Sequence, residues 1–279
     1  MIVKTLNVDL DYKALNLDNG EFQAKITLYL PHNYSAIDAS RKRPTIIICP
    51  GGAYVGTSCR EAEPIALKFI AEDFNAVVLN YSCAPARFPA SLCEVAWTVQ
   101  LLKEHAEEWN VDVDKLFVMG FSAGGHLAAS FGIFWDSEIL KNLFPGKDLS
   151  IKGMILSYPV ITSGEKAHRG SFKNLLGEDA SNEALLQTSL EKQVTETTVP
   201  AFIWHTFEDA AVPVENSLLL ASALSEKKVP FEMHIFPRGS HGLSLCTPVV
   251  YASDKTPLRG QENKIWIDLA INWIKNIDL

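Results

Sequence analysis

The sequence has few cysteines, and their positions exclude two classes of small protein. Its 279 residues include five cysteines, an odd number, and no two of them form a C-x-x-C pair. A secreted disulfide scaffold or a structural zinc site needs cysteines that are paired or closely spaced. We therefore expect reduced thiols, as in a cytoplasmic protein, at Cys49, Cys59, Cys83, Cys93 and Cys246.

The chain also lacks an excess of positive charge and a long apolar segment. Its 25 lysines and arginines are outnumbered by 33 aspartates and glutamates, so the formal net charge is -8. This charge disfavours general binding to nucleic acid or to an anionic membrane. No apolar run approaches the roughly 20 residues that span a bilayer, and the start of the chain is unlike a secretory signal. We expect a cytoplasmic protein with a small-molecule partner, and we leave assembly into a homo-oligomer open.

The short motifs that bind common cofactors and metals are missing as well. The sequence has no G-x-x-x-x-G-K loop, no dinucleotide fingerprint and no H-E-x-x-H pair. We therefore expect chemistry without a cofactor or a metal. Internal repeats and interdomain linkers are also absent, so we predict one domain over residues 1–279, long enough to bury a substantial core.

Short, continuous apolar runs recur along the chain. Such runs are typical of strands buried on both faces of a parallel sheet, whereas the alternation from Phe22 to Leu30 is typical of a half-exposed antiparallel strand. Helix-like segments separate the runs. The sequence therefore predicts an α/β fold, with a doubly wound, mostly parallel sheet and an antiparallel part near the N-terminus. The runs cover residues 45–49, 76–79, 116–119, 153–156, 201–204 and 231–236.

Two helices and two loops can be predicted in more detail. Ser91-x-x-Glu94 has the form of a capping box, which predicts a helix that opens there and runs toward Asn110. Apolar residues over 266–277 recur at helical spacing and predict a helix that packs on the sheet. The longest irregular zones, residues 159–180 and 243–262, are candidates for the walls of a binding pocket.

Residues 120–124 read Gly-Phe-Ser-Ala-Gly and follow the apolar run 116–119. G-x-S-x-G between a strand and a helix is the pattern of a nucleophile elbow, in which a sharp turn exposes the serine hydroxyl. The flanking residues must be small because the strand and the helix pass close together. The pattern predicts that Ser122 is a nucleophile.

A serine nucleophile needs a base and a carboxylate, which follow it in this architecture in the order serine, acid, histidine. We choose Asp209, in the loop after the run 201–204, because an acid a few positions before Val-Pro is usual in such families. The adjacent Glu208 is the alternative, and a helix cap is the structural alternative for either carboxylate. His241, in the loop after the run 231–236, is the predicted base. We expect His126 to pack beside the site.

Acyl transfer also needs N–H donors for the negatively charged oxygen of the tetrahedral intermediate. The first predicted donor is the backbone N–H of Ala123, directly after the nucleophile. The second is the N–H of Gly52 or Ala53, in the loop after the run 45–49. An ordinary Gly-Gly turn is the alternative interpretation of that loop.

Together these segments resemble the α/β-hydrolase superfamily, from about Lys42 onward. Within it the chain is similar to the small esterases near acetyl xylan esterase, a bacterial and fungal carbohydrate-esterase branch related to hormone-sensitive-lipase-like enzymes. The similar segments are Pro50 to Tyr54, Asn80 to Pro85, Gly120 to His126 and Tyr158 to Gly177. No long N-terminal segment precedes the first buried strand, so the resemblance implies little or no cap domain and no deep pocket for long acyl chains.

The resemblance implies a serine carboxylesterase for short-chain acyl esters, with acetyl groups on small sugars or xylo-oligosaccharides as candidate substrates. Tyr54 and Tyr158 are the candidate substrate-binding side chains. An amidase, such as an arylformamidase or a small-peptide hydrolase, would use the same residues and stays an alternative, because fold and triad do not determine the leaving group. A non-catalytic binding protein is the third interpretation, disfavoured by the complete set of serine, acid and histidine.

Overall fold

A computed structural model describes residues 1–251 and 259–278. Residues 252–258, which belong to the irregular zone predicted over 243–262, lie outside this description. The rest of that zone contains two short 3-10 helices, η3 (Pro248–Val250) and η4 (Gln261–Ile265).

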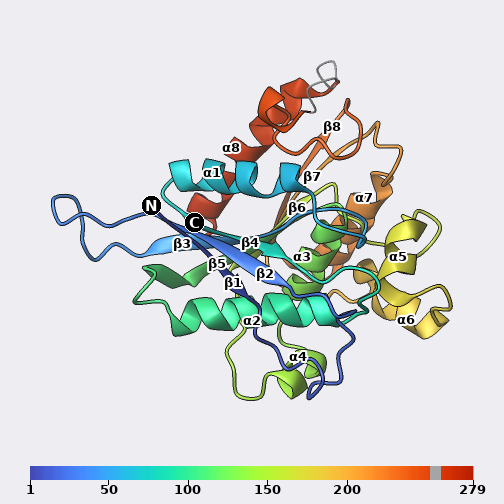
Figure 1. The fold of residues 1–279 in the computed structure, drawn as a ribbon. Helices are drawn as coiled ribbons and strands as arrows, with labels where there is room; N and C mark the ends of the chain where they lie inside the picture. Colours follow the sequence, from blue (N-terminus) through green and yellow to red (C-terminus); the bar gives the residue numbers. More distant parts are fainter. Residues whose placement is uncertain (252–258, 279) are drawn as a thin grey trace.

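Eight strands form one sheet in the order β1-β2-β4-β3-β5-β6-β7-β8 (Figure 1). Strands β3 to β8 run parallel, whereas β1 and β2 add an antiparallel part at one edge. This confirms the mostly parallel α/β sheet predicted from the apolar runs. The bounds are β1 (Ile2–Asn7), β2 (Lys25–Leu30), β3 (Arg43–Cys49), β4 (Asn75–Asn80), β5 (Val111–Phe121), β6 (Gly153–Ser157), β7 (Ala201–Thr206) and β8 (Phe231–Phe236).

Helices cover both faces of the sheet and create two separate hydrophobic cores (Figure 1). Successive residues of a strand point to opposite faces, and in β3 Ile47 belongs to one core while Ile46 and Ile48 belong to the other. The first core is covered by α2 (Ala90–Glu104), α3 (Ala123–Phe134) and α7 (Glu215–Glu226), and the second by α1 (Glu63–Ala71) and α8 (Trp266–Asn276). Burial on both sides therefore explains the apolar runs in β3 to β7, whereas β8, at the edge of the sheet, has no buried residue.

The predicted start of helix α2 is wrong. The helix begins at Ala90 with Pro89 at the N-cap, and no side chain caps it. Ser91 and Glu94 are buried inside the helix, where Glu94 bonds to Ser82 instead of closing a capping box. The helix also ends at Glu104, before the expected Asn110.

Short helical segments connect the larger elements. Between β6 and β7 the chain forms α5 (Arg169–Leu176), α6 (Asn182–Gln187) and η2 (Leu190–Lys192), a small insertion in place of a large cap. The other short elements are η1 (Cys59–Glu61) and α4 (Glu138–Leu143). In the part of the chain that the structure describes, no helix combines the length and the apolar character needed to cross a bilayer.

Candidate active site

Ser122 occupies a strained turn between the end of β5 and the start of α3. Its φ of 53° and ψ of -118° lie outside the conformations that non-glycine residues ordinarily adopt. The turn is possible because the neighbouring glycines lack side chains: a Cβ on Gly120 would lie 1.9 Å from the carbonyl oxygen of Gly124. This geometry is that of the nucleophile elbow predicted from the pentapeptide.

The three residues predicted to react are joined by hydrogen bonds. The Oγ of Ser122 lies 2.7 Å from Nε2 of His241, and Nδ1 of His241 lies 2.6 Å from Oδ2 of Asp209. This arrangement places the proton donor, its acceptor and the orienting carboxylate in the order that serine nucleophiles require. The loops after β7 and β8 carry Asp209 and His241, so the parallel sheet brings together residues that are far apart in sequence.

Asp209 is buried, with 5% of its surface exposed, and each of its carboxylate oxygens accepts two hydrogen bonds. The backbone N–H groups of Ala211 and Val212 donate to Oδ1, whereas His205 and His241 donate to Oδ2. Burial alone would raise the pKa of this carboxyl group, but the bonds from the histidines and the backbone lower it below its ordinary value. The carboxylate therefore stays ionised and can stabilise a protonated imidazole. The following helix α7 has no side-chain cap, so Asp209 does not cap it.

His205 also contacts the carboxylate of Asp209, which the sequence did not reveal. Its Nε2 lies 3.3 Å from Oδ2 of Asp209 and 3.0 Å from the carbonyl oxygen of Val212. Both partners are acceptors, so this nitrogen carries the proton, and Nδ1 accepts from the hydroxyl of Ser217 at 2.8 Å. His205 thus helps to fix the same carboxylate oxygen that His241 contacts. Its only sequence signal is its position four residues before Asp209.

Glu208, the alternative acid, points elsewhere. One of its carboxylate oxygens accepts the backbone N–H of Gly239 at 3.2 Å, and the other pairs with Arg259 at 2.8 Å. Gly239 belongs to the loop that carries His241, so Glu208 supports this loop without touching the imidazole.

The loop after β3 lies against the nucleophile. A Cβ on Gly51 would be 3.0 Å from Cβ of Ser122, so glycine is needed for this close approach. The N–H of Gly51 donates to Glu61, whereas within the described residues the N–H groups of Gly52, Ala53 and Ala123 donate to no protein acceptor. Ala123 is the first residue of α3, where the helix has no internal acceptor for it. These three predicted donors are thus available to a ligand.

Tyr54 and Tyr158, the candidate substrate-binding side chains, are buried. Only 2% of Tyr54 and 1% of Tyr158 is exposed, so neither offers a surface to a substrate. The hydroxyl of Tyr54 bonds to Nδ1 of His126 at 2.9 Å, and that of Tyr158 donates to Glu61 at 2.6 Å. In this structure the two tyrosines support the site from within the protein instead of contacting a ligand.

His126 packs below the elbow as a neutral side chain. Its Nε2 donates to the carbonyl oxygen of Thr188 at 2.8 Å, so Nδ1 is the acceptor of the Tyr54 hydroxyl. Burial lowers the pKa of His126 to about 4. The side chain therefore joins α3 to the insertion between β6 and β7 and takes no part in proton transfer.

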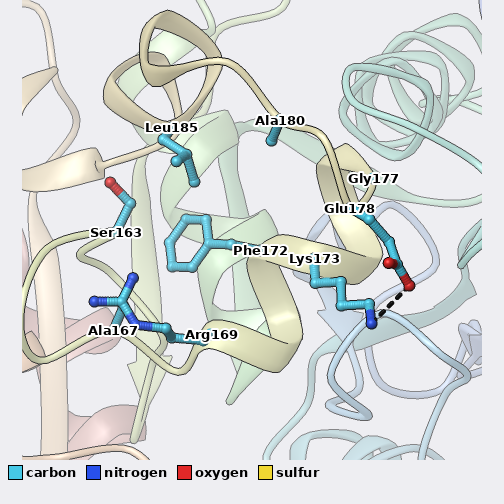
Figure 2. A pocket seen from close by; sticks show the side chains of 9 residues that line it. All are labelled: Ser163, Ala167, Arg169, Phe172, Lys173, Gly177, Glu178, Ala180 and Leu185. Carbon is cyan, nitrogen blue, oxygen red and sulfur yellow. Dashed lines mark ion pairs between the residues drawn. The ribbon is translucent and has the colours of Figure 1, made fainter.

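A pocket of about 360 Å³ lies in the insertion between β6 and β7 (Figure 2). Figure 2 shows Phe172 reaching across it toward Leu185, while Lys173 pairs with Glu178 at its rim. His168 precedes Arg169 of the lining, and burial together with the charge of His241 lowers the pKa of His168. The pocket is lined by none of Ser122, Asp209 and His241. Its lining consists of Ser163, Ala167, Arg169, Phe172, Lys173, Gly177, Glu178, Ala180 and Leu185.

Metal ligation has no candidate among the described residues, which contain no group of three or more His, Cys, Asp or Glu side chains arranged to hold an ion.

The mostly parallel sheet, the strained serine turn and the loops at the strand ends define an α/β hydrolase. Solved structures of this class match the chain over almost its whole length. An acetyl ester-xyloside bifunctional hydrolase from Caldicellulosiruptor lactoaceticus is 33% identical, with a TM-score of 0.82 over 99% of this chain and 96% of that one. The carboxylesterase Cest-2923 from Lactobacillus plantarum is 27% identical, with a TM-score of 0.86 over 100% and 98% of the two chains.

The chain belongs to the BD-FAE family, whose model matches residues 27–224. Among curated relatives, endo-1,4-beta-xylanase B of Butyrivibrio fibrisolvens is 41% identical over 74% of this chain, and acetylxylan esterase of Xylanibacter ruminicola is 28% identical over 99% of it. The chain spans 33% and 53% of the lengths of these two relatives. These matches confirm the resemblance to small esterases near acetyl xylan esterase.

Proposed function

We propose that the protein is a serine carboxylesterase that hydrolyses short-chain acyl esters through an acyl-enzyme. The observation that carries this proposal is the pair of short contacts, 2.7 Å and 2.6 Å, that join Ser122 to His241 and His241 to Asp209. The esterase names of the relatives support carboxylic ester hydrolysis as the reaction class.

In the first half of the proposed reaction, Ser122 attacks the ester carbonyl while His241 accepts its proton. The ionised Asp209 stabilises the imidazolium that forms and holds the ring in the correct tautomer. The negative oxygen of the intermediate is bound by the N–H of Ala123 and by that of Gly52 or Ala53. Ala123 begins a helix of 12 residues, whose dipole also favours negative charge there.

In the second half, His241 gives its proton to the departing alcohol and then activates a water molecule. The water attacks the acyl-enzyme while His241 takes one of its protons. The tetrahedral intermediate then collapses: the bond between the acyl carbon and Oγ of Ser122 breaks, the carboxylic acid leaves and His241 returns the proton to Oγ. No group other than the side chains and amides already named is needed for either half.

Acetyl groups on small sugars or xylo-oligosaccharides are the proposed substrates. Two similar proteins support this choice, an acetylxylan esterase and an acetyl ester-xyloside bifunctional hydrolase. The small insertion between β6 and β7, in place of a large cap, agrees with a short acyl group. The pocket of about 360 Å³ in this insertion falls in the size range of small-molecule sites.

The nucleophile can be tested with a fluorophosphonate probe, which reacts with an activated serine. We expect wild-type protein to be labelled and the Ser122→Ala variant to stay unlabelled, with both folded by circular dichroism. A folded wild-type protein that is not labelled would contradict the proposal.

The substrate class can be tested by comparing kcat/KM for p-nitrophenyl acetate, p-nitrophenyl octanoate and an N-formyl anilide. We expect the acetate to be hydrolysed fastest. Faster octanoate hydrolysis would exclude the short-chain specificity, and preference for the anilide would favour the amidase alternative.

A further inference from the structure

The segment Cys59–Glu61, which forms η1, lies between the loop after β3 and the loop that carries His241. Glu61 is buried, with 5% of its surface exposed, and its two carboxylate oxygens bind different parts of the site. The N–H of Gly51 donates to Oε2 at 2.8 Å, and the hydroxyl of Tyr158 donates to Oε1 at 2.6 Å. One carboxylate therefore joins the loop of the proposed oxyanion donors to a residue at the end of β6.

Tyr158 continues this connection to the histidine. Its hydroxyl accepts the backbone N–H of Ser244 at 2.9 Å, three residues after His241. Its ring lies 5.1 Å from the imidazole of His241, edge to face at 70°. Tyr158 also has a φ of 39°, a strained value for a residue with a side chain, and such strain is retained where the surroundings enforce it.

Arg60, the residue before Glu61, also holds η1 against the loop that follows His241. Its guanidinium donates to the carbonyl oxygen of Gly242 at 2.9 Å and to that of Val250 at 2.6 Å. Its own carbonyl oxygen accepts the hydroxyl of Ser244 at 2.5 Å. The backbone on both sides of Ser244 is thus tied to η1, and Glu61 is the member of η1 that also reaches the loop of Gly51.

The protonation of Tyr158 and Glu61 agrees with the hydroxyl of Tyr158 and the N–H of Gly51 both donating to the carboxylate of Glu61. Burial raises the pKa of Tyr158 well above its ordinary value, so the hydroxyl keeps the proton that it donates. Burial also raises the pKa of Glu61, opposed by the bonds from Tyr158 and Gly51 and by the charges of His241 and Arg60. Each oxygen of Glu61 thus accepts one bond from within the protein, Oε2 from Gly51 and Oε1 from Tyr158.

We propose that Glu61 is a positioning residue that sets the distance between the oxyanion loop and the catalytic histidine. The proposal rests on the esterase function proposed above and assigns to Glu61 no contact with the substrate. If Glu61 loses one acceptor, either the Gly51 loop or Tyr158 must shift, and the amides and the imidazole then no longer face the same reacting carbon. Displacements of this kind lower kcat more than they raise KM.

Glu61→Gln tests the proposal, because glutamine has the same shape but only one acceptor oxygen. We expect kcat for p-nitrophenyl acetate to fall by about 10- to 100-fold while KM changes by less than about threefold. Glu63→Gln is the control: Glu63 begins α1, two residues after Glu61, and accepts the hydroxyl of Tyr29 at 3.1 Å, away from the site. This control is expected to keep the kcat of the wild-type protein.

Tyr158→Phe provides a second test that keeps the ring beside His241 and removes only the hydroxyl. We expect kcat to fall by about 3- to 10-fold, the range for one lost hydrogen bond, with Tyr29→Phe as the matched control. If Glu61→Gln does not fold, judged by circular dichroism and thermal unfolding, the pair of tyrosine variants decides the question. If Glu61→Gln folds and its kcat is unchanged, the proposal is overturned. If only Tyr158→Phe folds, unchanged kcat in that variant overturns it. Equal losses in the Glu61 and Glu63 variants also overturn it.

The same assays separate this inference from the proposed function. Wild-type protein that neither hydrolyses p-nitrophenyl acetate nor reacts with the fluorophosphonate would overturn the esterase function itself. Active wild-type protein together with a fully active Glu61→Gln variant would overturn only the role of Glu61.

Discussion

The loop after β7 and the first turns of helix α2 each contain a buried carboxylate, Asp209 and Glu94, but the two carboxylates differ in acidity. Asp209 accepts bonds from two backbone N–H groups and from two histidines, and its pKa lies below its ordinary value in spite of burial. Glu94 accepts the N–H of Ser82 at 2.8 Å and the hydroxyls of Ser82 and Tyr12. Burial raises the pKa of Glu94 to about 7.

The difference shows what a buried carboxylate needs in order to serve a base. The two hydroxyls and the single backbone N–H that face Glu94 do not compensate for its burial. At Asp209 the bonds from two imidazoles and from the backbone, together with the charge of His241, do compensate for burial. Glu94 is therefore suited to hold the turn at Ser82 in place, and Asp209 is suited to stabilise a protonated histidine.

The largest predicted effect comes from removing the charge of Asp209. Asp209→Asn should lower kcat by about 10³- to 10⁴-fold, because the amide favours the wrong tautomer of His241 and cannot stabilise the imidazolium. Glu94→Gln is the matched control, since glutamine reproduces the hydrogen bonds of a neutral glutamic acid. We expect this control to keep kcat within about threefold. Measurements with p-nitrophenyl acetate would check both values, and similar losses in the two variants would remove the functional distinction between the carboxylates.

A second prediction concerns stability and pH. The pKa of Glu94 is about 7 in the folded protein against an ordinary value of 4.5, so between these values the folded state binds a proton that the unfolded chain has released. The contribution of Glu94 to the free energy of unfolding is thus fully present below pH 4.5 and is lost as the pH rises through 7. The loss amounts to about 3 kcal/mol.

Glu94→Gln isolates this contribution, because His126 acts in the opposite direction: its pKa is lowered to about 4, so its contribution is lost as the pH falls. Because both proteins contain His126, its contribution cancels when their free energies of unfolding are subtracted. Urea unfolding at several pH values gives the free energy of unfolding of each protein. The difference, variant minus wild type, should increase by about 3 kcal/mol between pH 4.5 and pH 8. A difference that stays constant over this range would contradict the raised pKa.

The smallest predicted effect belongs to Glu208. Its pair with Arg259 is partly exposed, and such ion pairs contribute little, about 0 to 1 kcal/mol. Glu208→Gln keeps an acceptor for the N–H of Gly239, so we expect kcat to fall by less than about threefold. A loss as large as that of Asp209→Asn would show that the wrong one of the two adjacent carboxylates had been chosen.

Much of the fold could be predicted because buried strands leave a local signal. The six apolar runs all fall within strands. In five of them burial on both faces favours an apolar residue at nearly every position, whereas the run 231–236 forms the edge strand β8, in which no residue is buried. Strand β1 (Ile2–Asn7) was missed because nearly all of its residues are exposed, so its sequence has no burial pattern. The start of α2 was mistaken because Ser91 and Glu94 have the spacing of a cap, whereas Glu94 instead binds a partner in the preceding turn.

The candidate site was predictable only where chain order and short motifs constrain it. Ser122 has a pentapeptide pattern, and Asp209 and His241 follow strands in the expected order. Glu61 has no such pattern: its partners Gly51 and Tyr158 come from separate strand ends, and only the folded sheet brings them together. Tyr158 has the same limitation, because the sequence suggests an aromatic residue near the site but not which way its hydroxyl points.

The position of β8 at the edge of the sheet has a consequence for the order of synthesis. His241 follows β8, which pairs only with β7, and lies 119 residues after the serine it contacts. During translation the central strands and the serine turn can form before the last strand has left the ribosome. In the proposed mechanism Ser122 therefore gains its base only when β8 and the loop after it join the sheet, so the proposed activity depends on the last strand to be added.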